Sequence, residues 1–121
     1  MVIALFSQEI NESVSNVIES FFSTKHAKHS KFFLENKIFN NFNSDNNLEL
    51  ISFSKSEDLD SSIDIMVSIG GDGTFLRSIE FIRDLDIPVM GINTGNLGFL
   101  ATIKRENIEQ SIEKIYTQKF K

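Results

Sequence analysis

One carboxylate lies among glycines immediately after a short apolar segment in the middle of the chain. The apolar residues 65–69 are rich in β-branched side chains, which predicts a buried parallel strand. Residues 70–73 then read Gly-Gly-Asp-Gly, and glycine permits positive φ and close approach of backbone N–H groups to a ligand. Because a carboxylate repels phosphate, Asp72 is suited to accepting a hydroxyl proton beside a bound phosphate. The pattern predicts phosphoryl transfer to an alcohol.

The alternative is a tight turn from strand to helix, in which Asp72 or Thr74 caps the helix. The following residues predict a helix that carries its apolar residues on one face, namely Phe75, Leu76, Ile79 and Ile82. Two other phosphate loops are excluded. No lysine follows the glycines as in a P-loop, and Leu76 stands where a dinucleotide fingerprint has its third glycine.

A second motif begins about twenty residues later. Residues 87–92 predict another short strand, with the only proline, Pro88, at its entrance. The strand leads into residues 93–100, Asn-Thr-Gly-Asn-Leu-Gly-Phe-Leu, and such Asn and Gly residues tolerate left-handed conformations that let a loop fold tightly. In a parallel sheet, loops at the carboxyl ends of neighbouring strands meet in one crevice. The loops that contain Asp72 and Asn93 are therefore predicted to face one site.

These two motifs together resemble the amino-terminal half of the NAD kinases, and the resemblance covers residues 64–103. NAD kinases phosphorylate the 2′-hydroxyl of the adenosine ribose of NAD and so make NADP. The first motif is shared with diacylglycerol and sphingosine kinases and, more loosely, with phosphofructokinases. The continuation at residues 93–100 is much more specific to NAD kinases.

The resemblance implies roles for individual residues. Asp72 matches the aspartate that activates the ribose hydroxyl, and the residues expected to bind nucleotide are Gly71, Asp72, Gly73, Arg77, Asn93 and Phe99. Arg77 could equally be a solvated helix charge, and Phe99 could be core packing. The resemblance implies ATP as phosphoryl donor with a divalent cation, Mg²⁺, and no residue is assigned as a metal ligand. The residues alone leave ATP, another nucleoside triphosphate and polyphosphate open as the donor. If Gly71 and Gly73 adopt positive φ, alanine at either position should harm the loop.

Members of this family are longer than 121 residues and carry a second, β-rich domain with an Asn-Glu or Asn-Asp motif. Nothing after Phe99 supplies that motif, and residues 105–121 have apolar side chains at helical spacing. This tail is a final helix or a connection to another domain. We expect residues 1–121 to be a single α/β domain, the amino-terminal part of a two-domain kinase, and to be inactive alone. The resemblance also implies a dimer or tetramer.

Strand and helix patterns alternate along the rest of the chain. The elements expected before the glycine motif are a strand at 1–6, a helix at 8–24, a short strand at 32–34, a turn of helix within the Asn-rich stretch 36–47 and a strand at 48–53. This order predicts a Rossmann-like α/β fold, with a mostly parallel sheet and helices on both faces.

The composition suits one small globular domain, because 40% of the 121 residues are hydrophobic. No segment is long enough to span a membrane, and the apolar amino terminus lacks the basic flank of a signal peptide. We therefore expect a cytoplasmic protein. The absence of cysteine excludes disulfides and thiolate metal sites, and the net charge of −5 argues against nucleic-acid binding. The expected partners are NAD and ATP, with no nucleic acid and no membrane.

Two other functions remain open from the sequence. The first is a lipid kinase of the diacylglycerol or sphingosine type, against which residues 97–100 argue. The second is a nucleotide-binding module without catalytic activity, in which the two loops bind a nucleotide and regulate a partner.

Overall fold

The computed structural model of the chain describes residues 1–42, 47–94, 103–104 and 108–117. The described strands form one sheet of six parallel strands in the order β3-β2-β1-β4-β5-β6. The strands are β1 (Val2–Phe6), β2 (Lys31–Glu35), β3 (Glu49–Phe53), β4 (Ile65–Gly70), β5 (Val89–Asn93) and β6 (Ile103–Lys104). The helices are α1 (Glu12–Ser23), α2 (Asn36–Phe42), α3 (Asp72–Ile82) and α4 (Ile108–Thr117), with short 3₁₀ turns at Ala27–His29 and Ser56–Asp58.

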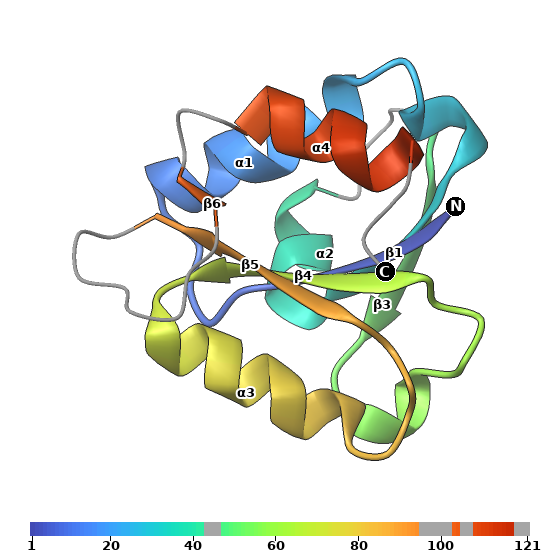
Figure 1. Cartoon of the computed structure of the whole chain (residues 1–121), viewed down its shortest axis with the longest axis vertical. Coiled ribbons are helices and arrows are strands. Elements are labelled where there is room, and N and C mark those ends of the chain that lie inside the picture. Colours follow the sequence, from blue (N-terminus) through green and yellow to red (C-terminus); the bar gives the residue numbers. More distant parts are fainter. Residues whose placement is uncertain (43–46, 95–102, 105–107, 118–121) are drawn as a thin grey trace.

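Helices cover both faces of the sheet, as the sequence predicts (Figure 1). Buried residues of α1, α2 and α4 share one core cluster with the alternate strand residues Ile3, Leu5 and Val67. The helix α3 contributes Ile82 to the cluster on the opposite face, together with Ala4 and Met66. This in-and-out alternation follows from the pleat of a strand, and it makes both faces of the central strands apolar.

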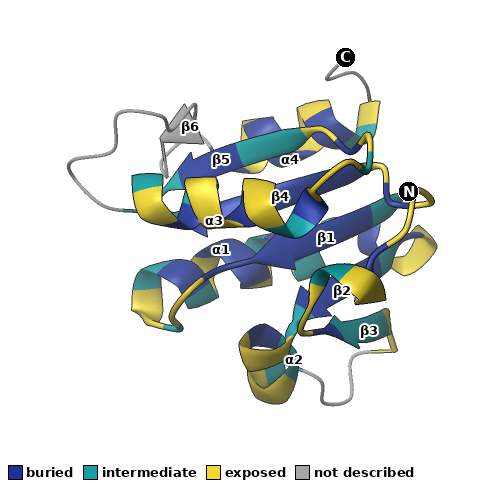
Figure 2. Ribbon diagram, turned by 90° about the horizontal axis from the view of Figure 1, so that it is seen from below, coloured by how far each residue is buried: buried dark blue, intermediate teal, exposed yellow. Residues whose placement is uncertain are grey.

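The strand β1 lies in the middle of the sheet, between β2 and β4. From β1 the chain moves outward through β2 and β3, and it then returns to the other side of β1 to add β4, β5 and β6. Both β1 and β4 are buried along most of their length (Figure 2). The boundary between β1 and β4 is thus the switch point of the sheet, and ligands of open α/β sheets bind at the carboxyl ends of strands there.

The helix α1 begins four residues later than its apolar spacing indicates. The predicted helix starts at Gln8, whereas α1 starts at Glu12, with Asn11 as its N-cap. The Oδ1 atom of Asn11 accepts a hydrogen bond from the Val14 amide at 2.9 Å, which satisfies one of the free donors of the first turn. Residues 7–11 therefore form a loop at the carboxyl end of β1.

The buried face of α3 coincides only in part with the apolar face that the sequence suggests. Its buried residues are Thr74, Ser78 and Ile82, whereas Leu76 and Ile79 are 54% and 45% exposed. Small side chains allow the helix to lie close to the sheet, and a Cβ placed on Gly91 of β5 would be only 2.9 Å from the ring of Phe75. The exposed residues of α3, drawn in yellow in Figure 2, lie on the side of the helix away from the sheet.

The end of the chain differs in part from expectation. The sequence predicts a helix in this region, and α4 packs Ile112 and Ile115 into the core beside α1. Tyr116 of α4 stacks on His26 with a centroid distance of 4.4 Å, and its hydroxyl accepts a hydrogen bond from Ser30 Oγ at 3.0 Å. Burial raises the pKa of Tyr116. The short strand β6 was not predicted. No described helix is long and apolar enough to cross a membrane.

Candidate active site

Residues that follow three of the strands lie at the carboxyl edge of the sheet around the switch point. They are residues 7–11 after β1, residues 70–73 at the end of β4 and Thr94 after β5. The ends of β4 and β5 are in register, with Gly70 opposite Asn93, and the Thr94 amide donates to the Gly70 carbonyl at 3.1 Å. The strand ends that carry Asp72 and Asn93 are thus neighbours in space, as expected for a parallel sheet.

Gly70 is the position in this loop that requires glycine. Its φ is +152°, and a Cβ there would lie 2.7 Å from Thr74 Oγ1. Because side chains rarely adopt this φ and cannot approach so closely, another residue would strain the turn or displace α3. Gly71 and Gly73 do not adopt the positive φ on which the predicted effect of alanine depended. Among the described glycines, only Gly70 has a positive φ.

Gly71 and Gly73 leave open space above the loop instead. A Cβ on Gly71 would meet nothing within 4 Å, and one on Gly73 would meet only Gln8 Oε1 at 3.9 Å. Gly71 has extended backbone, with φ −107° and ψ −163°, and is the N-cap of α3. The side on which a Cβ would project is therefore open at Gly71 and is bordered by Gln8 at Gly73.

Asp72 is the first residue of α3 and is half-buried. It does not occupy the N-cap, because that position belongs to Gly71, which has no side-chain cap. Thr74 is not the cap either, since its Oγ1 donates to Gln8 Oε1 at 3.0 Å. The assignment of Asp72 or Thr74 as the N-cap is therefore wrong, whereas the tight turn is confirmed, because only Gly71 separates β4 from α3. Asp72 lies in the first turn of the helix.

The remaining predicted residues lie in different settings. Arg77 is exposed on α3, where its Nη1 atom lies 3.6 Å from Glu80 Oε1, and an exposed pair of this kind contributes little to stability. Asn93 is half-buried at the end of β5. Phe99 and most of the second motif fall within residues 95–102, outside the described residues.

Gln8 and Lys37 also belong to this edge, and the sequence reasoning missed both. Gln8 follows β1 and contacts the first turn of α3 through Thr74. Lys37 follows β2, and its Nζ donates to the Gln8 carbonyl at 2.9 Å. Their positions after the first two strands were the available signal, because loops at the carboxyl ends of parallel strands share one edge.

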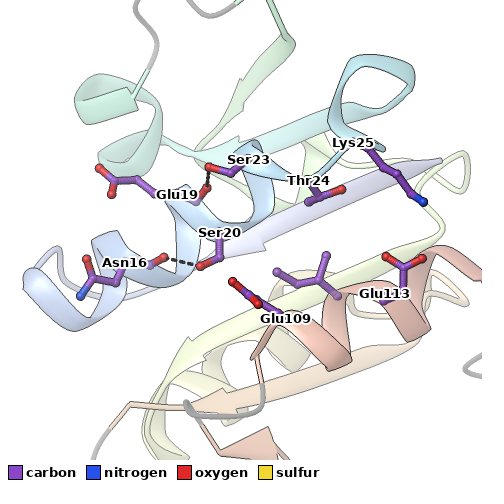
Figure 3. A pocket seen from close by; sticks show the side chains of 9 residues that line it. Asn16, Glu19, Ser20, Ser23, Thr24, Lys25, Glu109 and Glu113 are labelled. Atoms are coloured by element: carbon purple, nitrogen blue, oxygen red, sulfur yellow. Dashed lines mark hydrogen bonds between the residues drawn. The ribbon is translucent and has the colours of Figure 1, made fainter.

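The described structure also has a hollow of about 650 Å³ between α1 and α4 (Figure 3). Its charged lining is mostly acidic, with Glu19, Glu109 and Glu113 beside Lys25. The hydroxyls of Ser20 and Ser23 bond to carbonyls of their own helix. Carboxylates repel phosphate, and the hollow lies within the helical layer and away from the glycine loop. We therefore assign the candidate site to the carboxyl edge of the sheet.

Among the described residues, no group of three or more His, Cys, Asp or Glu side chains is placed to hold a metal ion. The glycine loop itself supplies one carboxylate, Asp72.

Comparison with known proteins gives a consistent result. A family model for the ATP-NAD kinase N-terminal domain matches residues 3–120. The chain is 39% identical over 122 residues to an NAD kinase of Christiangramia forsetii and 37% identical over 124 residues to one of Flavobacterium psychrophilum. Each match covers 99% of this chain but 42% of the relative, so the chain spans less than half the length of these proteins.

A solved structure also has the same fold. The structure of yeast NADH kinase complexed with NADH matches with a TM-score of 0.74 over 93% of this chain and 35% of its own chain. The identity is 17%, so this likeness concerns the fold alone.

Proposed function

Because the chain belongs to the NAD kinase family, as its amino-terminal domain, we propose that the protein containing it phosphorylates NAD to NADP with ATP. The single observation that carries this proposal is the position of Asp72. Its carboxylate lies at the start of α3, between two glycines with open space above them, at the switch point of a parallel sheet. The catalytic assignment of Asp72 and the nucleotide-binding roles of Gly71, Gly73, Arg77, Asn93 and Phe99 are parts of the same proposal.

The reaction is an in-line transfer in which positioning does most of the work. The ribose 2′-hydroxyl oxygen attacks the γ-phosphorus of ATP, Asp72 accepts the hydroxyl proton, and the bond from the γ-phosphorus to the β-phosphate oxygen breaks to release ADP. Gly71 and Gly73 let the phosphates approach the backbone, where the first turn of a helix has N–H groups without intrahelical partners. Mg²⁺ enters with ATP and offsets the charge of its phosphates.

The proposed activity belongs to the longer protein. The curated relatives are more than twice as long as the aligned segment, and we expect their remaining part to supply substrate contacts that this domain lacks. We also propose a dimer or tetramer, a cytoplasmic location and no nucleic-acid partner. The net charge of −5 supports the last point.

The test is NADP formation from NAD and ATP–Mg²⁺ by the product of the longest open reading frame that contains the chain. The same protein is assayed with diacylglycerol and with sphingosine as acceptors. NADP formation without lipid phosphorylation supports the proposal. Lipid phosphorylation without NADP would favour a lipid kinase, and nucleotide binding without any turnover would favour a regulatory module.

A further inference from the structure

The loop between β1 and α1 reaches the glycine loop through the side chain of Gln8. Gln8 Oε1 accepts the hydroxyl hydrogen of Thr74 at 3.0 Å and lies 3.9 Å from the position of a Cβ on Gly73. Thr74 is buried, with 7% of its surface exposed, whereas Gln8 is exposed. The carboxamide of Gln8 therefore packs against the first turn of α3 and lies on one side of the glycine loop.

This contact orients the carboxamide of Gln8. Its oxygen accepts from Thr74 and is the Gln8 atom nearest to the position of a Cβ on Gly73, and its nitrogen, Nε2, carries two further N–H donors. An amide nitrogen donates to oxygen ligands and carries no charge that would attract a cation. The N–H donors of the Gln8 carboxamide are thus suited to binding an oxygen-rich anionic group.

A cation is bonded to the backbone of the same residue. Lys37 Nζ donates to the Gln8 carbonyl at 2.9 Å, and this bond uses one of the three N–H groups of the ammonium. None of the ion pairs between described residues includes Lys37. The nearby Glu35 carboxylate accepts from the Lys37 backbone amide at 2.9 Å. In a chain of net charge −5, a cation held at this edge contributes positive potential for a phosphate group.

We propose that Gln8 Nε2 and Lys37 Nζ bind the phosphate chain of the phosphoryl donor on the β1 side of the glycine loop. This inference rests on the proposed function and adds a donor subsite to it. The donor lies between Gln8 and the loop, so that its terminal phosphate reaches Asp72. The shared ligand chemistry is a chain of phosphates, which ATP and inorganic polyphosphate both provide.

The informative substitution is Gln8→Glu in the full-length protein. It keeps the side-chain length and the oxygen that accepts from Thr74, but it replaces the amide donor with a negative oxygen. A residue that only positions Thr74 would tolerate this change. A phosphate ligand would not, and we expect the KM for the donor to rise about tenfold or more while the KM for NAD stays within about twofold.

The matched control is Gln110→Glu, the same change of charge at an exposed residue of α4, which should leave both KM values unchanged. Lys37→Met should also raise the donor KM, and it keeps the proposal testable if Gln8→Glu fails to fold. Each donor that the wild-type protein uses, ATP–Mg²⁺ or polyphosphate, is titrated separately to identify the source of the phosphates.

Unchanged donor KM values in a folded Gln8→Glu protein, or a rise in the KM for NAD alone, would overturn the subsite. A wild-type full-length protein that makes no NADP would instead overturn the proposed function, so the two failures are distinguishable.

Discussion

Gly70, Gly71 and Gly73 lie within four consecutive residues, yet the structure requires glycine only at Gly70. Gly70 has a backbone conformation that side chains rarely adopt, and it contacts Thr74 closely. Gly71 and Gly73 have space around them, and their lack of a side chain benefits an approaching ligand. The sequence predicts a glycine loop beside Asp72, but it cannot say which glycine maintains the fold, because that depends on φ and on the position of α3.

We therefore predict that alanine destabilises the fold at Gly70 but not at Gly71. Gly70→Ala should lower the free energy of unfolding by about 1–3 kcal/mol, because the residue keeps a strained φ and crowds Thr74. Gly71→Ala should leave that free energy unchanged within about 0.5 kcal/mol. Urea unfolding of residues 1–121 measures both, and equal destabilisation by the two variants would contradict this division.

In the full-length protein, Gly71→Ala should nevertheless reduce NADP formation, since the added methyl group occupies space that the proposal gives to the nucleotide. Full activity of this variant would argue that the nucleotide does not approach Gly71.

At the scale of elements, the sequence predicts the strands well and the helix limits less well. The segments at 1–6, 48–53 and 65–69 became strands close to their predicted limits. The first and the third are largely apolar, as buried parallel strands are, whereas 48–53 alternates weakly. The start of α1 was misplaced since Ile10 continues the apolar spacing, whereas the side chain of Asn11 ends the loop by capping. Because the predicted helix began at Gln8, the prediction missed that Gln8 lies in the loop after β1.

The cap of α1 leads to a second prediction. Asn11→Ala should lower the free energy of unfolding by about 1 kcal/mol, because the Val14 amide loses its acceptor. Asn16→Ala is the control, since Asn16 is exposed inside the same helix and alanine is the better helix former there. Urea denaturation compares the two, and a loss for Asn16→Ala as large as for Asn11→Ala would refute the capping role.

The limits of prediction at this scale are also physical. The apolar residues Leu76 and Ile79 lie on the outer side of α3, because Thr74 and Ser78 are small enough to bring the helix against β4 and β5. Helical periodicity identifies an apolar face, but it does not say which side packs on the sheet. The strand β6 has two described residues, too few for a period-two pattern.

At the scale of the whole molecule, two core clusters enclose the sheet. One cluster lies under α1, α2 and α4, and the other lies under α3. Residues distant in sequence contact one another. Tyr116 of α4, for example, stacks on His26 and hydrogen-bonds with Ser30. Such contacts make unfolding cooperative in small domains.

We predict that residues 1–121 unfold in one cooperative transition in urea yet form no NADP. Coincident transitions by far-UV circular dichroism and by tyrosine fluorescence of Tyr116, the only tyrosine, would confirm the first part. Separate transitions by these probes would show that α4 docks independently of the sheet. NADP formation by this chain alone would show that the domain needs no further part for turnover.

The measurement that tests the central claim most directly is the turnover of the full-length protein with Asp72→Asn. Asparagine keeps the size of the side chain but cannot accept the ribose proton, so kcat for NADP formation should fall by about 10²–10⁴-fold. The melting temperature and the KM for NAD should change little, because Asp72 is only half-buried at the end of α3. A variant that folds, binds NAD and turns over at nearly the wild-type rate would contradict the assignment of Asp72 as the general base.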